Sequence, residues 1–342
     1  MQQPKTGVVL LILMLAAMAM VPIVSADETQ NLALQQDIRT IVRTPVRLAD
    51  PAETIMASTQ QSPQTYAMPE NDKQEIFKAI DKSILSKKEK TELKKKLGEI
   101  WSGTPKLSDD EKKAVFSTVY SIVMKPDVIK PTWSGYPVDP YYMDVHNDMA
   151  WIAGYSMGLG QNSADTLKSM AGQPDVPPPS ASWNHYYSSG AADQAAWYAY
   201  LSSNEWISDH SQALQYLAYS MHYIADMSQP FHYWFAQSLP QHAEYENFVG
   251  QNWHSSDLNF YNSAANDGYY YYITNVRDSA SYLAWRTHYS QNQYDYINDK
   301  ILNDPNWRTD QTLIRYTREC LVDGERYQMG LVDWVQRNVN AA

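Results

Sequence analysis

The sequence has almost no cysteine: Cys320 is the only one. A single thiol cannot form a disulfide within the chain, and structural zinc sites built on two or four cysteines are excluded as well. Nothing near Cys320 indicates a nucleophile, so we expect a buried free thiol in a C-terminal helix. Stability must then come from a hydrophobic core, and 342 residues are enough to bury one.

Positive charge is also scarce. The 27 Lys and Arg residues stand against 38 Asp and Glu residues, which gives a formal net charge of -11. Stable binding of duplex nucleic acid needs a basic face, so this class of function is excluded. An enzyme that handles nucleic acid or lipid at a cationic metal site is not excluded.

The N-terminus has the pattern of a secretory signal. Lys5 precedes an apolar run from Val8 to about Val24, and Val24-Ser25-Ala26 has the small residues of a signal-peptidase site. We therefore predict a signal peptide over residues 1–26. The alternative is a membrane anchor, because the run is nearly long enough to span a bilayer. Under either interpretation the rest of the chain lies outside the cytoplasm, and the first predicts a secreted protein.

The composition changes near residue 132. Residues 27–132 carry 17 basic and 16 acidic side chains, whereas residues 133–342 carry 9 and 22. Ten of the eleven tryptophans and all eight histidines lie in the second part. We infer two units: a small helical segment over 27–132, and a unit of single-domain size over 133–342. Composition leaves open whether the first is a propeptide or an accessory segment.

Hydrophobic periodicity predicts an all-α protein. Residues 71–97 and the C-terminal residues 312–339 have helical patterns, and a capping box at Ser108–Glu111 opens a further helix to about Met124. A Pro- and Gln-rich stretch from about residue 44 to residue 69 is typical of a linker. Tyr269–Tyr272 is apolar enough for a strand, although a loop is equally compatible with it.

One stretch of 25 residues concentrates metal-ligand side chains. His222 and Asp226 are four residues apart on a predicted helix, which places both on one face, and His242 and Glu246 repeat this spacing. His232 lies between the two pairs. Imidazole nitrogens and carboxylate oxygens are the ligands that hydrolytic zinc takes. A single pair arises often by chance, but two pairs with a histidine between them favour a metal site.

These strings resemble a known family. His222-Tyr-Ile-Ala-Asp226-Met-Ser-Gln-Pro-Phe-His232, followed by His242-Ala-Glu-Tyr-Glu246, is similar to the motif of the trizinc bacterial phospholipase C family, whose relatives include the fungal single-strand nucleases. The resemblance covers essentially all of residues 133–342 and none of 27–132. It implies an all-α domain that holds three zinc ions, preceded here by a small helical pro-segment.

The resemblance also implies ligands upstream of the motif. The mature chains of the family begin with Trp-Ser, whose terminal amine and carbonyl bind zinc, and a histidine follows thirteen residues later. Trp133-Ser134 and His146 match this spacing. Asp175 and His185 fill the next two ligand positions.

By resemblance, the nine ligands form three groups with Asp226 as a bridge. The groups are Trp133, His146 and Asp226; Asp175, His185, His222 and Asp226; and His232, His242 and Glu246. Because a peptide nitrogen is a poor zinc ligand, a role for the Trp133 amine requires a cut after Thr132. The resemblance therefore implies that residues 27–132 are a propeptide, with an accessory helical segment as the alternative.

The implied activity is hydrolysis of a phosphodiester. A phospholipase C would release diacylglycerol and a phosphorylated headgroup through attack by zinc-bound hydroxide. Asp175 is the candidate for activating or orienting the water, with a purely ligating role as the alternative. The expected partner is a phospholipid or another phosphodiester substrate. The protein is expected to be a monomer that contacts a membrane surface transiently. Two other functions stay open: a zinc-dependent single-strand nuclease or nucleotidase, and a secreted zinc-binding protein without catalysis.

The sequence departs from the family where choline is bound. Members that cleave phosphatidylcholine place a glutamate and two aromatic residues there, whereas this chain has Tyr136, Val176 and Ser182. The headgroup is therefore not implied. Glu246, where the nuclease branch tends to have Asp, and the long spacing between Trp133 and His146 favour the lipid branch.

Other residues with catalytic potential are expected to be structural. Gly154-Tyr155-Ser156-Met157-Gly158 matches the nucleophile elbow of serine hydrolases, but the elbow needs a strand before the serine. The segment instead continues a helical pattern, so we expect its glycines to allow close helix packing. His210, His254 and His288 lack ligand partners at suitable spacing, and we expect surface or core positions for them.

Overall fold

The structure, a computed structural model, describes residues 45–53, 68–102, 107–123, 145–175, 182–290 and 292–339. Within these ranges the chain is almost entirely helical, with one sheet of two short strands, which confirms the predicted all-α class. No helix of the described residues is both long and apolar enough to cross a bilayer. The predicted signal peptide and the boundary at residue 132 lie outside the described ranges, so both stay predictions.

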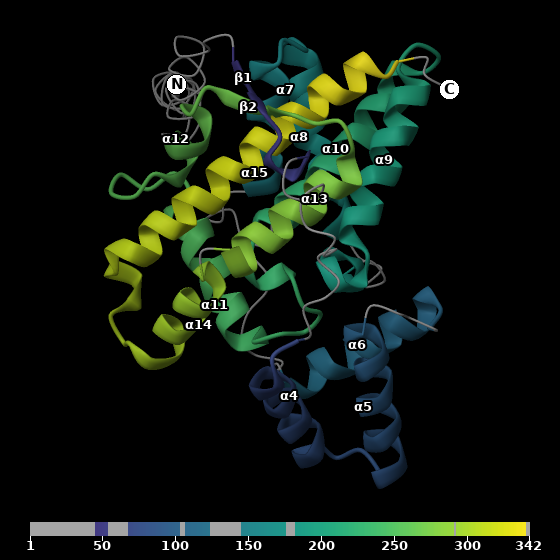
Figure 1. The fold of residues 1–342 in the computed structure, drawn as a ribbon, viewed down its shortest axis with the longest axis vertical. Helices are drawn as coiled ribbons and strands as arrows, with labels where there is room; N and C mark the ends of the chain where they lie inside the picture. The colour runs from purple at the N-terminus through teal and green to yellow at the C-terminus, as the bar shows by residue number, and fades with distance from the viewer. Residues whose placement is uncertain are drawn as a thin grey trace, which may run out of the picture. The chain divides into compact units, whose positions relative to one another are not determined.

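The described chain consists of α-helices, with short 3-10 turns between some of them (Figure 1). The strands are β1 (Val46–Ala49) and β2 (Tyr269–Tyr272). The helices are α4 (Glu70–Lys82), α5 (Lys87–Trp101), α6 (Asp109–Val123), α7 (Val145–Ser156), α8 (Gln161–Ala171), α9 (Ala191–Glu205), α10 (His210–Ser228), α11 (Leu239–Asn252), α12 (Phe260–Ala265), α13 (Val276–Trp285), α14 (Gln293–Asn303) and α15 (Gln311–Arg337). The short turns are η2 (Gln173–Asp175), η3 (Ser182–His185), η4 (Tyr187–Ser189), η5 (Pro230–His232), the π-turn η6 (Arg286–Ser290) and η7 (Trp307–Thr309).

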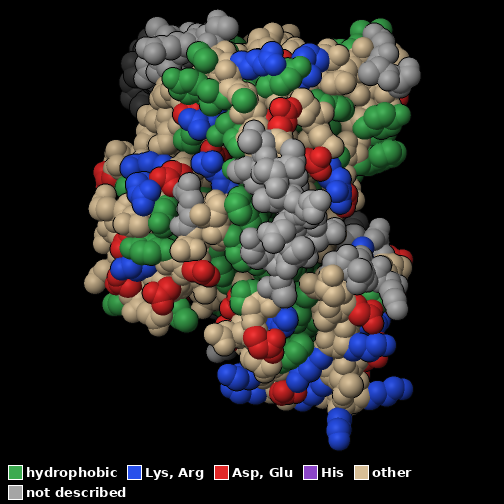
Figure 2. Space-filling view, in the orientation of Figure 1, with side chains coloured by type: hydrophobic (Ala, Val, Ile, Leu, Met, Phe, Trp, Pro, Cys, Tyr) green, Lys and Arg blue, Asp and Glu red, His purple; other side chains and the backbone are tan. Residues whose placement is uncertain are grey.

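Helices α5 and α6 each begin at a serine that forms a capping box. The capping box predicted at Ser108 is present, since the Ser108 N–H donates to the Glu111 carboxylate at 3.0 Å. The helical pattern predicted over residues 71–97 is confirmed, except that a break divides it into α4 and α5. Ser86 starts the second helix with a capping box of its own: its N–H donates to the Glu89 carboxylate at 2.7 Å. The lysines of these helices lie mostly at the surface (Figure 2).

The two strands pair in parallel, with Val46 opposite Tyr269 and Ala49 opposite Tyr272. This answers the question left open for residues 269–272, which are a strand. It also corrects the linker prediction for residues 45–53, which are ordered and paired. Residues 54–67 lie outside the described ranges. The pairing joins segments more than two hundred residues apart, so local sequence patterns give no sign of it.

Helix α10 lies at the centre of the helical packing. It contacts α7, α8, α9, α13 and α15, and nearly all of its residues from Ala213 onward are buried. In Figure 1, α15 runs obliquely past α10 with α13 and β2 beside it, and these pairs are in contact. The pair His222 and Asp226 predicted from its spacing therefore lies in the interior rather than on a helix surface.

Two glycines allow helices to approach closely. Gly154, the first glycine of the elbow-like motif, lies within α7, and a Cβ there would come within 2.5 Å of Leu167 Cδ1 on α8. No strand precedes Ser156 among the described residues 145–155, so the serine-hydrolase elbow is absent. Gly330 of α15 lies against β2, where a Cβ would clash with the Tyr271 carbonyl oxygen.

We predict that Gly330→Ala destabilises the protein by about 1–3 kcal/mol, because a methyl group would force α15 away from the β2 backbone. Gly98→Ala is the matched control, since a Cβ at that position in α5 meets nothing within 4 Å. The control should leave stability unchanged or raise it by up to about 1 kcal/mol through helix propensity. Urea unfolding of both variants measures the difference. Equal stability of the two variants would contradict the close approach.

Candidate metal centre

The predicted ligands converge from helix ends and short turns. His146 is the second residue of α7, and Asp175 and His185 end η2 and η3. His222 and Asp226 lie one turn apart on α10. The remaining ligands come from the chain that follows: His232 ends η5, and His242 and Glu246 lie one turn apart on α11. Among the predicted ligands in the described ranges, every one joins the same region.

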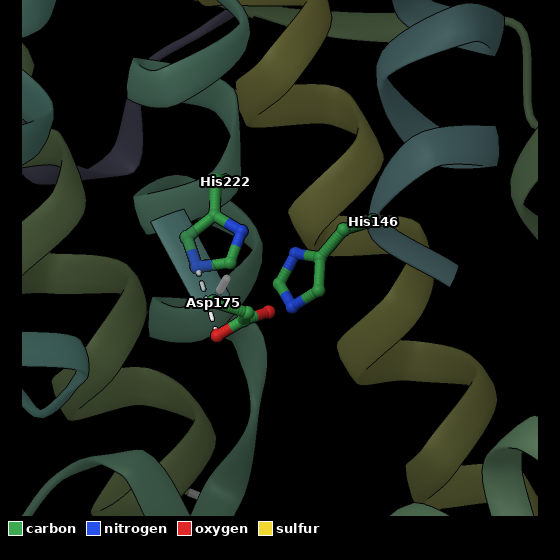
Figure 3. Close-up of side chains that lie close together, drawn as sticks. All are labelled: His146, Asp175 and His222. Atoms are coloured by element: carbon green, nitrogen blue, oxygen red, sulfur yellow. Dashed lines mark ion pairs between the residues drawn. The ribbon is translucent and has the colours of Figure 1, made fainter. Parts of the chain in front are cut away.

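The first group consists of His146, Asp175 and His222, whose candidate ligand atoms all lie within 4.8 Å of one another (Figure 3). His222 Nε2 lies 3.7 Å from Asp175 Oδ1. The rings of His146 and His222 stack with centroids 4.2 Å apart. In Figure 3 the Asp175 carboxylate lies below the two imidazoles, which approach it from α10 and α7. The group can thus present two nitrogens and one oxygen to a cation.

The second group shares His222 with the first and adds His185 and Asp226. His185 Nδ1 lies 2.8 Å from Asp226 Oδ2, and His222 Nε2 lies 3.3 Å from the same oxygen. The two imidazole nitrogens face each other at 2.9 Å. Asp175 is also near, with Oδ1 3.6 Å from His185 Nδ1. These four side chains are those that the resemblance assigned to one zinc ion.

The third group consists of His232, His242 and Glu246. His242 Nε2 lies 2.7 Å from Glu246 Oε1, and His232 Nε2 lies 3.0 Å from His242 Nε2. His232 Nε2 is also 3.3 Å from Glu246 Oε1. All three side chains are less than one tenth exposed, so the group is closed off from bulk water.

Asp226 connects the groups. Its Oδ1 lies 3.0 Å from His232 Nδ1 and 3.7 Å from His146 Nε2, while its Oδ2 faces His185 and His222. A carboxylate has two oxygens that can face different cations, and this one is only 1 % exposed. Asp226 therefore lies between the ligand groups, and its role as a bridge between metal ions stays a prediction.

Burial and neighbouring charges shift the pKa values of these groups in opposite directions. Burial alone would lower the pKa of His222, but the carboxylates of Asp175 and Asp226 raise it to about 9. For His232, burial is likewise outweighed by Asp226 and Glu246, which raise its pKa to about 10. Burial would raise the pKa of Asp226, yet the surrounding imidazoles hold it well below its usual value. The buried carboxylates are thus stabilised by adjacent positive charge, which either protonated histidines or bound metal ions can supply.

The donor set fits zinc. Tetrahedral zinc with bonds of about 2.0–2.1 Å places neighbouring ligand atoms about 3.3 Å apart. The separations between ligand atoms within the second and third groups run from 2.7 to 3.3 Å. Imidazole and carboxylate are the ligand types of hydrolytic zinc sites. Metal binding itself stays a prediction.

No family model matches the sequence, and no curated protein sequence matches it. Among solved structures, the alpha toxin from Clostridium absonum matches with a TM-score of 0.26 and 16% sequence identity. The match covers 82% of this chain, which spans 65% of the toxin chain. A likeness at this TM-score does not establish a shared fold or activity.

A second polar cluster surrounds Asp148, two residues after His146, and no sequence pattern indicated it. Asp148 is 6% exposed and accepts hydrogen bonds from Lys168 Nζ at 2.6 Å and Trp253 Nε1 at 2.9 Å. His254 Nε2 lies 2.9 Å from the same carboxylate. Burial opposes ionisation, but His254 and Lys168 lower the pKa of Asp148 to about 2. This cluster fixes the start of α7 and so positions His146.

Gln229 orients Glu246 in a similar way. Its side-chain amide donates to Glu246 Oε1 at 3.3 Å, and its amide oxygen accepts from the Phe231 N–H. Gln229 lies in the quoted motif, but its spacing does not indicate a contact with Glu246. The contact arises only because η5 turns the chain back toward α11.

The residues expected outside the site have separate environments. His210 is exposed, and Cys320 is buried with its thiol 3.3 Å from Gln293 Oε1, as predicted. His254 has a carboxylate partner after all, because Asp148 reaches it from a helix more than one hundred residues earlier. His288 is buried, and its Nδ1 donates to the Pro230 carbonyl at 2.7 Å.

Part of the predicted site lies outside the described residues. Trp133, Tyr136 and Val176 are in the ranges that the structure does not describe. Ser182 begins η3, but its side chain is not described either. The ligand role of Trp133 and the expected departure from choline binding therefore stay predictions.

We predict that His242→Ala and Glu246→Gln each lower the zinc content of the purified protein by about one ion per chain. Each change removes one of three convergent ligands from a closed group. His210→Ala is the control, because this exposed histidine lies outside the three groups. Elemental analysis by mass spectrometry measures the content. Unchanged zinc in both ligand variants would rule out the third group as a zinc site.

A second prediction concerns acid stability. Burial lowers the pKa of His288 to about 3, against a value of about 6.5 in an unfolded chain. The unfolded state therefore takes up this proton first, and stability falls as the pH drops from about 6.5 toward 3, by up to about 1.4 kcal/mol per unit.

His288→Gln should reduce the pH dependence of the unfolding free energy by the equivalent of up to one bound proton. It should also lower stability at pH 7, because the ring packing against Tyr233 and Tyr294 is lost. Urea unfolding at pH 7 and pH 5 compares the two proteins. The same pH slope in both would show that His288 does not contribute.

Proposed function

We propose that this protein is a secreted zinc-dependent phosphodiesterase whose substrates are phospholipids cleaved in the manner of a phospholipase C. The observation that carries the proposal is the buried cluster in which Asp226 joins three groups of candidate ligands. Several cations held this close together suit a substrate with negative charge spread over adjacent oxygens. A phosphodiester has this charge distribution.

Zinc ions bound here would lower the pKa of a water toward about 7 and neutralise charge on the phosphate. The protein side chains would hold these ions and place the water. Asp175 suits the placement of water because its side chain is 17% exposed, whereas those of His185, His222 and Asp226 are at most 6% exposed. A carboxylate at the accessible edge of the cluster can accept a proton from an incoming water.

Aromatic side chains hold the imidazoles in place. Phe231 stacks on His242 with centroids 5.7 Å apart and ring planes 3° from parallel. Tyr223 lies against both His185 and His222, with its hydroxyl 3.0 Å from the Asn184 side-chain amide. Packed aromatic side chains exclude water, so charges beside them are screened less. This strengthens the attraction between a cation cluster and a bound phosphate.

The choice of phospholipid among phosphodiesters rests on the resemblance of the motif strings and on Glu246 as the last ligand. The predicted signal peptide supports secretion, and the predicted cut before Trp133 would add a free amine to the ligands His146 and Asp226. The altered residues at the choline positions leave the headgroup to experiment.

Product mass spectrometry tests the proposal. The protein is prepared without its leader, loaded with zinc, and used both before and after a cut preceding Trp133. Each form is incubated with mixed phospholipids and single-stranded DNA, with and without chelator. We expect chelator-sensitive release of diacylglycerol and a phosphorylated headgroup. Nucleotide 5′-phosphates instead would move the protein to the nuclease branch, and no product from either substrate would favour a zinc-binding protein without catalysis.

Asp175→Asn should lower kcat/KM at least about a hundredfold, because an amide cannot accept the proton of the water. Zinc in the group of His232, His242 and Glu246 should be retained, so the total zinc content falls by no more than about one ion. Asp257→Asn, which changes an exposed carboxylate, is the control. Activity of Asp175→Asn within a few fold of the wild type would assign that carboxylate no role in proton transfer.

A further inference from the structure

The segment 45–53 is anchored in the helical core by more than strand pairing. Asp50 follows β1 and is only 2% exposed. Its carboxylate accepts hydrogen bonds from the Ala52 N–H at 2.9 Å, from the Tyr327 hydroxyl at 2.9 Å and from the Ser279 hydroxyl. Tyr327 lies on α15 and Ser279 on α13, so one carboxylate ties the N-terminal segment to two helices of the C-terminal part.

Helices α4, α5 and α6 are anchored at a second place. Trp101 Nε1, at the end of α5, donates to the Phe235 carbonyl at 2.9 Å, and Trp101 is 4% exposed. The Gln237 side-chain amide donates to Asp72 on α4. On α6, the Phe116 ring lies 5.3 Å from the Phe235 ring, centroid to centroid. The contacts meet the turn that follows η5.

This second anchor reaches the candidate metal centre. The Phe116 ring is 6.2 Å from the Tyr186 ring, and Tyr186 in turn lies 5.2 Å from His232 and 6.1 Å from His242, centroid to centroid. Tyr186 therefore contacts both α6 and the third ligand group. Residues on both sides of position 132 also share one hydrophobic core. From the N-terminal side it includes Ile76, Ile80, Leu93, Leu97, Ile100, Val115 and Val119.

We propose that the surface formed by β2, α13, α15 and the Phe235 turn is a binding site for the chain's own residues 45–53, 68–102 and 107–123, and that it holds them after the connection is cut. A cut before Trp133 would then yield a two-chain protein in which 45–123 stays bound. The proposal does not depend on the phosphodiesterase activity.

Two features explain why the parts would stay together. Separation would leave the Ser279 and Tyr327 hydroxyls without the buried acceptor they share, and unpaired buried polar groups are costly. It would also expose apolar surface around Phe235 and Tyr186 to water. The two anchors are separate in space and sequence, so releasing one leaves the other holding the segment at a high effective concentration.

The test cuts the full chain, without its leader, at a protease recognition sequence introduced between Val123 and Thr132. Native mass spectrometry and size-exclusion chromatography then follow the two pieces without denaturant. We expect one particle that contains both pieces in a 1:1 ratio. Elution of the C-terminal piece without residues 45–123, whether folded or aggregated, would overturn the proposal.

Variants in the N-terminal piece test each anchor. Cut protein is mixed with isotope-labelled cut protein, and the exchange of pieces is followed by native mass spectrometry. Asp50→Asn and Trp101→Phe should each speed exchange by about tenfold or more, since each weakens a buried hydrogen bond. The controls change exposed side chains: Glu53→Gln in the N-terminal piece and Trp197→Phe in the C-terminal piece. If Asp50→Asn does not fold, Trp101→Phe still tests the second anchor, and exchange as slow as in the controls would contradict it.

Discussion

The contact on which the site depends is that of one buried carboxylate, Asp226, with four imidazoles. Its two oxygens face His146 and His232 on one side and His185 and His222 on the other. An ionised carboxylate in the interior is unfavourable unless positive charge surrounds it. The neighbouring histidines therefore have to carry protons or hold metal ions. Removal of Asp226 would leave the ligand groups without the element that joins them.

The helical packing buries this charge together with its partners. Helix α10 carries His222 and Asp226 into the centre, where α7, α8, α9, α13 and α15 surround it. A residue pair on a surface helix would be screened by water and would have little effect on its neighbours. In the interior the carboxylates of Asp175 and Asp226 raise the pKa of His222 to about 9 even though burial opposes this. Burial in the core thus strengthens the electrostatic interaction between two side chains whose spacing in the sequence is common.

The N-terminal segment has an unexpected relation to this core. Its composition differs from that of the C-terminal part, yet its apolar residues pack into the same core and Asp50 accepts hydrogen bonds from α13 and α15. Composition reports how exposed residues are distributed, and the lysines of α4 and α5 lie mostly at the surface (Figure 2). The buried faces of the same helices carry Ile, Leu and Trp and are not distinguished from the rest of the protein.

Local spacing was sufficient to predict the helical class, the pairs His222–Asp226 and His242–Glu246, and the capping box at Ser108. In each case a helix turn fixes the geometry of residues three or four apart. The upstream ligands His146, Asp175 and His185 came from a resemblance, because no local rule relates them to α10. Only the tertiary structure decided that β1 pairs with β2, that Asp148 holds His254, and that Gly330 lies against Tyr271. These contacts join residues far apart in the chain, and they depend on how all the helices pack rather than on the period of any one of them.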